Sequence, residues 1–110
     1  MLDRAHRLSS PAHFRRVIRR GRRGQHGSVL VYVEASPSTE PRFGFVVAKT
    51  VGNAVTRNLV KRRLRAVARE LLATAHGDVV VRALPTAGEV SATQLTDDFE
   101  AALRVAGGVI

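Results

Sequence analysis

The sequence predicts an α+β fold, a small mixed β-sheet with helices packed on it, in a single domain that spans residues 1–110. Two observations support this fold class. Apolar residues recur at helical spacing in three segments, and between these segments they alternate with a period of two or form short β-branched runs. The length allows one modest core but not two. We expect the order α-β-β-α-β-α, with an additional short strand allowed for near residues 22–27.

The first helix is predicted to begin at Ser9–Pro11, because a Ser can cap a helix and a Pro at the first helical position has no N–H to satisfy. Phe14, Val17 and Ile18 then follow the i, i+3, i+4 spacing of one helix face. Gly21 is expected to end this helix.

Two strands are predicted next, Ser28–Ala35 and Arg42–Lys49. In the first strand one face holds Val29, Val31 and Val33, and the other holds Leu30, Tyr32 and Glu34. The second strand places Phe43, Phe45 and Val47 on one face. The segment Ser36–Pro41 contains two prolines, and we expect it to join the two strands as a hairpin.

The second half of the chain is predicted to begin with a long helix, capped by Asn53, that runs to about Ala75 and stops at Gly77. A β-branched strand, a loop and a last helix should follow: Asp78–Leu84, then Pro85–Gly88, then a helix capped by Ser91 or Thr93 that ends near Val105.

On a helical wheel the long helix has a narrow apolar stripe formed by Val60, Leu64, Val67 and Leu71. Beside it lies an i, i+4 ridge of cations, Arg57, Lys61, Arg65 and Arg69, which Asn58 and Arg62 extend. Cations in such a row repel one another by a few tenths of a kcal/mol per pair. An ordinary solvated face would intersperse Glu, whereas this helix offers only Glu70. The pattern therefore predicts a surface that binds a polyanion.

The composition supports the same interpretation. Eighteen Lys and Arg residues stand against nine Asp and Glu, which gives a formal net charge of +9 and an isoelectric point near 11.7. A second basic cluster surrounds the end of the first helix: Arg15, Arg16, Arg19, Arg20, Arg22 and Arg23. The helix dipole accounts for about two of these six. A nucleic acid or an anionic membrane would match this charge, and the preference for Arg suits structured RNA.

Other function classes are disfavoured. The longest apolar runs, Val29–Val33 and Val79–Val81, fall far below the ~20 residues of a membrane helix. A membrane-surface helix would need a bulkier apolar face than the narrow stripe described above. No secretory signal precedes the domain, so we expect a cytoplasmic location. The chain has no cysteine, which excludes disulfides and thiolate metal sites.

No catalytic residue and no protein-bound metal are predicted. The carboxylates are scattered, and the one tight group, Asp97, Asp98 and Glu100, is expected on a solvated helix face. The four histidines lack the spacing of metal ligands. Phe14 and Tyr32 stay open between two roles, core packing and stacking on an unpaired base.

The run from Lys49 to Arg65 resembles the signature of the bacterial ribonuclease P protein subunit, with its Gly-Asn-Ala-Val, Arg-Asn and Lys-Arg elements in the same order and spacing. Arg7–Ser10 followed by Phe14, and the strand residues Leu30–Tyr32, resemble the same family. The similarity extends over essentially the whole chain.

This resemblance implies a small basic cofactor of a catalytic RNA that removes the 5′ leader of precursor tRNA in a magnesium-dependent hydrolysis. The implied partners are ribonuclease P RNA and precursor tRNA, with Mg²⁺ bound mainly by the RNA and with a monomeric protein subunit. The residues implied to bind the catalytic RNA are Arg57, Asn58, Lys61, Arg62 and Arg65, to which the ridge adds Arg69. Phe14, Tyr32 and Lys49 match the leader cleft, and Arg15, Arg16 and Arg19 are expected to make additional phosphate contacts.

The chain departs from the family pattern at three positions. Leu59 stands where a second Arg is usual, Thr50 where a second Lys is common, and Ile18 where a second cleft aromatic is often found. Arg63 could supply the positive charge that Leu59 lacks. The alternative function is that of another RNA-binding or ribosome-assembly protein, which would bind RNA without stimulating cleavage.

Overall fold

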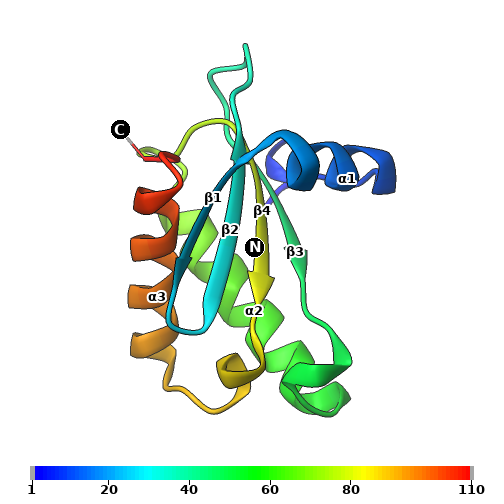
Figure 1. Ribbon diagram of the computed structural model, residues 1–110, viewed down its shortest axis with the longest axis vertical. Helices are drawn as coiled ribbons and strands as arrows, with labels where there is room; N and C mark the ends of the chain where they lie inside the picture. Colours follow the sequence, from blue (N-terminus) through cyan, green and yellow to red (C-terminus); the bar gives the residue numbers. More distant parts are fainter. Residues whose placement is uncertain (1, 110) are drawn as a thin grey trace.

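The computed structural model describes residues 2–109 and confirms the α+β class (Figure 1). The helices are α1 (Pro11–Arg20), α2 (Ala54–Glu70) and α3 (Ala92–Val105). The strands are β1 (Arg22–His26), β2 (Val29–Glu34), β3 (Arg42–Val46) and β4 (Asp78–Ala83), so the additional short strand near residues 22–27 is real. Three 3-10 turns complete the fold: η1 (Arg4–His6), η2 (Lys49–Val51) and η3 (Pro85–Gly88).

The four strands form one mixed sheet in the order β1-β2-β4-β3. The predicted hairpin between β2 and β3 is wrong, because β4 lies between them, antiparallel to β2 and parallel to β3. The physical reason is the composition of β4: Val79, Val80 and Val81 are all fully buried, which requires cover on both faces and a neighbour on each side. The hairpin that does form joins β1 to β2 through a turn at Gly27, whose φ of +53° favours glycine.

The two faces of the sheet carry different cover. Helices α2 and α3 lie on one face, while α1 crosses one end of the other (Figure 1). The alternation predicted for β2 is confirmed, because Val29, Val31 and Val33 join the α2–α3 core whereas Leu30 and Tyr32 join the α1 core with Val17 and Val80. The sheet therefore has one closed face and one face that α1 covers only in part.

The predicted helix caps are present. Ser10, Asn53 and Ser91 each accept a hydrogen bond from the backbone N–H three residues later. Helix α2, however, ends at Glu70 rather than near Ala75. Residues 71–76 bend toward the end of the chain instead, where the His76 N–H donates to the Gly108 carbonyl at 2.9 Å and Ala75 bridges to Val109.

Strand β3 also ends earlier than predicted, at Val46, so Lys49 lies in the turn η2 and not on a strand. The pairing of β3 with β4 stops at the pair Val46–Arg82, and after Val46 the chain turns through η2 into α2. None of the helices in residues 2–109 combines the length and the apolar content needed to cross a bilayer.

Candidate nucleic-acid interface

The outer face of α2 carries the predicted basic surface. Its core stripe is buried as predicted, with Val60, Leu64 and Val67 almost inaccessible and Leu71 packed at the margin of the core. On the opposite side a shallow groove runs between long side chains, lined by Asn58, Lys61, Arg62, Arg65, Ala66, Arg69 and Glu70. We call these residues the α2 groove. Five of the six predicted RNA-binding residues of this helix are thus brought together.

Arg57, the sixth, does not line this groove. Its side chain is half-buried, and its Nε atom is buried without a hydrogen-bond partner among the described residues. A buried donor without an acceptor is unfavourable, so Arg57 is held in a position that an external acceptor would improve. Arg63 lies one helical turn after Leu59 on the same side of α2, and both side chains are half-buried. Arg63 can therefore place a positive charge near the position where the family usually has a second Arg.

Phe14 of α1 lies at the β3 edge together with cations from α2. A small cleft there is lined by Arg7, Leu8, Phe14, Phe43, Gly44, Phe45, Lys61 and Arg65, and we call it the Phe14 cleft. The ring of Phe14 packs directly on the backbone of Gly44, where an added Cβ would lie 2.3 Å from Phe14 Cζ. Lys61 and Arg65 therefore border both the α2 groove and an aromatic ring, a combination suited to a nucleotide.

The other two predicted cleft residues do not line the Phe14 cleft. Tyr32 is 9% exposed and packs in the α1 core with Val17, Leu30 and Val80. Lys49 is exposed in η2. Of the three residues that the resemblance assigned to a leader cleft, Phe14 is the one that lines this cleft, whereas Tyr32 contributes mainly to the core beneath it.

The structure adds Arg82, which the sequence pattern did not single out. It lies on the central strand β4, paired in register with Leu30 and Val46, and so faces the side of the sheet that α1 only partly covers. It is half-buried and has no carboxylate partner among residues 2–109. Arg23 and Gln25 of β1 face the same side, because they pair with Tyr32 and Leu30. Period-two alternation with Val80 was the available signal for Arg82.

Most of the positive charge is free of internal partners. Within the described chain, Arg16 and Arg42 are the arginines that form ion pairs with carboxylates, Arg16 with Glu34 at 2.9 Å and Arg42 with Asp78 at 2.9 Å. Arg15 and Arg19 are exposed and unpaired in that part of the chain. The positive potential of the α2 groove and of the Phe14 cleft is therefore available to an external polyanion.

The sequence predicted that Asp98 lies on a solvated helix face, but this prediction is wrong. Asp98 is 1% exposed and lies beneath the β1–β2 turn. Its carboxylate accepts hydrogen bonds from the backbone N–H and hydroxyl of Ser28, from Gln94 and from His26. Burial raises the pKa of Asp98, but the hydrogen bonds from Ser28, Gln94 and His26 together outweigh burial and hold the pKa at about 2. This residue stabilises the fold and has no part in the basic surfaces.

A group with metal-ligand chemistry, His13, Glu34 and Asp78, comes together near α1 with its donor atoms within 4.8 Å of one another. The sequence could not reveal it, because the three residues come from three distant elements. Both carboxylates are already neutralised, Asp78 by Arg42 and Glu34 by Arg16. Magnesium prefers an octahedral shell of oxygen ligands and water. Two guanidinium groups at the same carboxylates do not fit such a shell.

Comparisons with known proteins give a consistent result. The family model for Ribonuclease P matches residues 2–107. The chain is 47% identical over 115 residues to the ribonuclease P protein component of Nocardioides sp., with 100% of this chain and 98% of the relative covered. It is 44% identical over 108 residues to the ribonuclease P protein component of Kocuria rhizophila, with 96% of each chain covered.

Solved structures show the same fold. The RNase P protein of Staphylococcus aureus superposes with a TM-score of 0.87 at 27% identity, covering 97% of this chain and 100% of that one. The RNase P protein of Thermotoga maritima superposes with a TM-score of 0.77 at 24% identity, covering 86% of this chain and 91% of that one, which supports the fold alone.

Proposed function

The chain belongs to the ribonuclease P protein family, and we propose that it acts as the RNA-binding subunit of the ribonuclease P holoenzyme, an endoribonuclease that matures the 5′ ends of tRNA. The protein supplies binding surfaces, and the RNA subunit performs the hydrolysis. The observation that supports this division most directly is the contrast between two basic surfaces without internal partners and a set of carboxylates that are either scattered or already neutralised.

The catalytic RNA is the proposed ligand of the α2 groove. Its cations project from one face of a helix whose other face is fixed in the core, so their spacing is set before RNA arrives. Because the helix backbone is already ordered, the ordering cost on binding phosphates is confined to the Lys and Arg side chains. Affinity for RNA should then fall with salt by about 0.7–0.9 log units per log unit of salt for each phosphate contact.

The single-stranded 5′ leader is the proposed ligand of the α1 side of the sheet. Phe14 offers a ring for stacking, Lys61 and Arg65 offer charge beside it, and Arg82 offers a cation from the centre of the sheet. Stacking and charge bind a single strand with little sequence preference. Because mature tRNA lacks the leader, these interactions favour the precursor.

Magnesium belongs to the RNA partner in this proposal, since the His13–Glu34–Asp78 group does not fit the ion. The protein instead reduces the repulsion between catalytic RNA and substrate, which lowers the magnesium concentration that the complex requires. We expect the free subunit to be a monomer that acts in the cytoplasm.

The test is cleavage of precursor tRNA by a bacterial ribonuclease P RNA at low magnesium, with and without this protein. The proposal predicts release of the 5′ leader that depends on the protein. Tight and salt-sensitive RNA binding without any stimulation of cleavage would contradict it and would favour the role of an RNA-assembly protein.

A further inference from the structure

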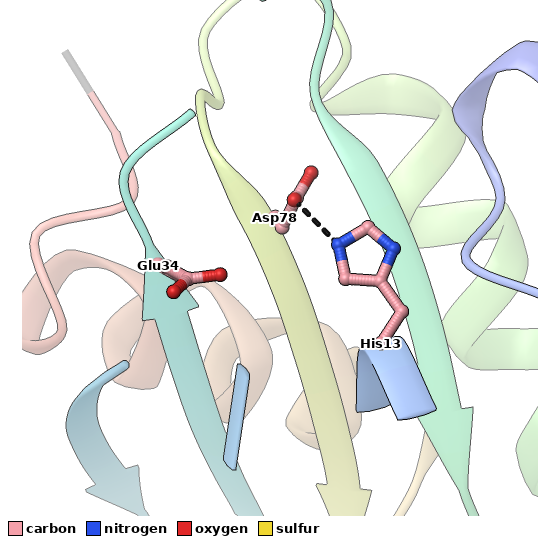
Figure 2. Close-up of side chains that lie close together, drawn as sticks. All are labelled: His13, Glu34 and Asp78. Atoms are coloured by element: carbon pink, nitrogen blue, oxygen red, sulfur yellow. Dashed lines mark hydrogen bonds and ion pairs between the residues drawn. The ribbon is translucent and has the colours of Figure 1, made fainter. Parts of the chain in front are cut away.

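A network of charged groups joins α1 to three strands of the sheet. Asp78, whose side chain is 2% exposed, receives two hydrogen bonds from Arg42, Nε to Oδ1 at 2.9 Å and Nη2 to Oδ2 at 3.0 Å. From α1, His13 Nε2 lies 2.8 Å from Asp78 Oδ2, and Arg16 Nε donates to Glu34 Oε1 at 2.9 Å. Figure 2 shows His13 pointing from the helix to Asp78, with Glu34 on the far side of Asp78.

The direction of the His13 hydrogen bond follows from its acceptor. Asp78 is already paired with a guanidinium, and an ionised carboxylate only accepts hydrogen bonds, so we assign the hydrogen to Nε2 of His13. Arg16 Nη2 also lies 3.0 Å from this nitrogen, but with the hydrogen on Nε2 both groups are donors, so this contact is not a hydrogen bond. His13 therefore supplies the hydrogen bond from α1 to the buried carboxylate, and Arg16 of the same helix adds a longer ion pair, with its Nη2 3.7 Å from Asp78 Oδ2.

This network lies one side-chain row away from the Phe14 cleft, on the same face of the sheet. Asp78 pairs in register with Arg42, and Val80, two residues further along β4, pairs with Gly44. Side chains two residues apart on a strand point to the same face. Phe14, the neighbour of His13 on α1, rests on Gly44. The His13–Asp78 contact and the ring of Phe14 are thus adjacent both along the helix and across the sheet.

We propose that the buried Asp78 carboxylate, acting through His13, is a positioning device that sets the place of Phe14 on the sheet and so the preference for precursor over mature tRNA. The inference rests on the leader-binding role proposed above. Without the hydrogen bond α1 keeps its apolar packing, since Val17 is fully buried, and it keeps the Arg16–Glu34 pair, but the polar contact made by the residue next to Phe14 is absent. A ring misplaced over Gly44 then stacks less well on a leader base.

The experiment uses the holoenzyme reconstituted with a bacterial ribonuclease P RNA, and it measures the ratio of the affinities for precursor and mature tRNA. His13→Leu removes the donor while the Asp78–Arg42 pair stays intact, and His13→Gln restores an N–H donor. His26→Leu is the matched control, because His26 also contacts a buried carboxylate, Asp98, but on the α3 side of the sheet.

We expect His13→Leu to lower the affinity ratio by at least about threefold, which is part of the roughly 5- to 150-fold loss that removal of base stacking in Phe14→Ala should cause. His13→Gln should return most of the ratio, and His26→Leu should leave it unchanged even if it lowers the melting temperature. In a Phe14→Ala background, His13→Leu should have no further effect, since it acts through the ring.

Two results would overturn the inference while leaving the proposed function intact: an unchanged ratio in His13→Leu, or effects of His13→Leu and Phe14→Ala that simply add. If Phe14→Ala itself leaves the ratio unchanged, the leader-binding role of this cleft is wrong, and the positioning role is wrong with it.

Discussion

At the scale of single residues, the most informative side chains are those whose surroundings the sequence could not show. Asp98 illustrates this. Beside Asp97 and Glu100 it looks like part of an acidic helix face, yet it is buried and holds the β1–β2 turn through Ser28. Ser28, one of its hydrogen-bond donors, lies about 70 residues away in the sequence, whereas Gln94 lies one helical turn before it. Only the contact with Gln94 can be seen in a sequence pattern.

We predict that Asp98→Asn lowers the free energy of unfolding by about 2 kcal/mol at neutral pH. This value follows from the difference between the folded pKa of Asp98, about 2, and its ordinary pKa of 3.8. Because the folded pKa is depressed, this contribution is complete above the ordinary value and is lost as the pH falls toward 2. Chemical denaturation at several pH values measures it, with the exposed neighbour Asp97→Asn as control. Equal stability of the two variants at pH 7 would show that Asp98 is dispensable.

Arg82 gives a residue-scale prediction for RNA binding. Arg82→Ala should lower the preference for precursor over mature tRNA by roughly 5- to 30-fold, because it removes one charge-assisted hydrogen bond worth ~1–2 kcal/mol. Arg104→Ala serves as the control, since Arg104 is an exposed arginine of α3, on the other face of the sheet. If both variants reduce the preference equally, the effect is one of net charge and Arg82 has no specific role.

At the scale of elements, the sequence predicted what is local and missed what is distant. The helix starts followed from Ser10, Asn53 and Ser91 acting on backbone groups three residues away. The pairing of β4 between β2 and β3 joins segments far apart in the chain, such as Val33 with Val79. Nothing in the strand periodicity of β2 and β3 distinguishes a hairpin from two strands with an inserted partner. The unbroken valine run of β4 was the one indication of a central strand.

The cationic outer face of helix α2 was predictable, because the same 3.6-residue period that buries Val60 and Leu64 places its cations outside. We predict that Arg62→Ala combined with Arg69→Ala weakens binding of the catalytic RNA. The variant should also reduce the slope of log affinity against log salt by about 1.4–1.8, the value for two phosphates that are no longer neutralised. Filter binding over a salt series measures both quantities, and an unchanged slope would place the RNA elsewhere.

At the scale of the whole molecule, the sheet separates the two surfaces to which we assign different RNAs. Helices α2 and α3 cover one face of the sheet, and α1 crosses the other (Figure 1). The α2 groove lies on the outer side of the first layer, whereas the Phe14 cleft and Arg82 lie on the α1 side. A net charge of +9 would draw RNA to both surfaces, and their different positions on the molecule are the basis of our proposal that each one binds a different RNA. Lys61 and Arg65, which border both, join the two surfaces at the β3 edge.

We propose that these surfaces hold different RNAs, and a crossed measurement separates the two roles. The affinity for the catalytic RNA and the ratio of affinities for precursor and mature tRNA are both measured in Arg62→Ala/Arg69→Ala and in Arg82→Ala. We expect the first variant to lose affinity for the catalytic RNA and to keep the ratio, and the second variant to keep that affinity and to lower the ratio. If both variants changed both quantities together, the two surfaces would form a single RNA-binding site, and the proposed division would be wrong.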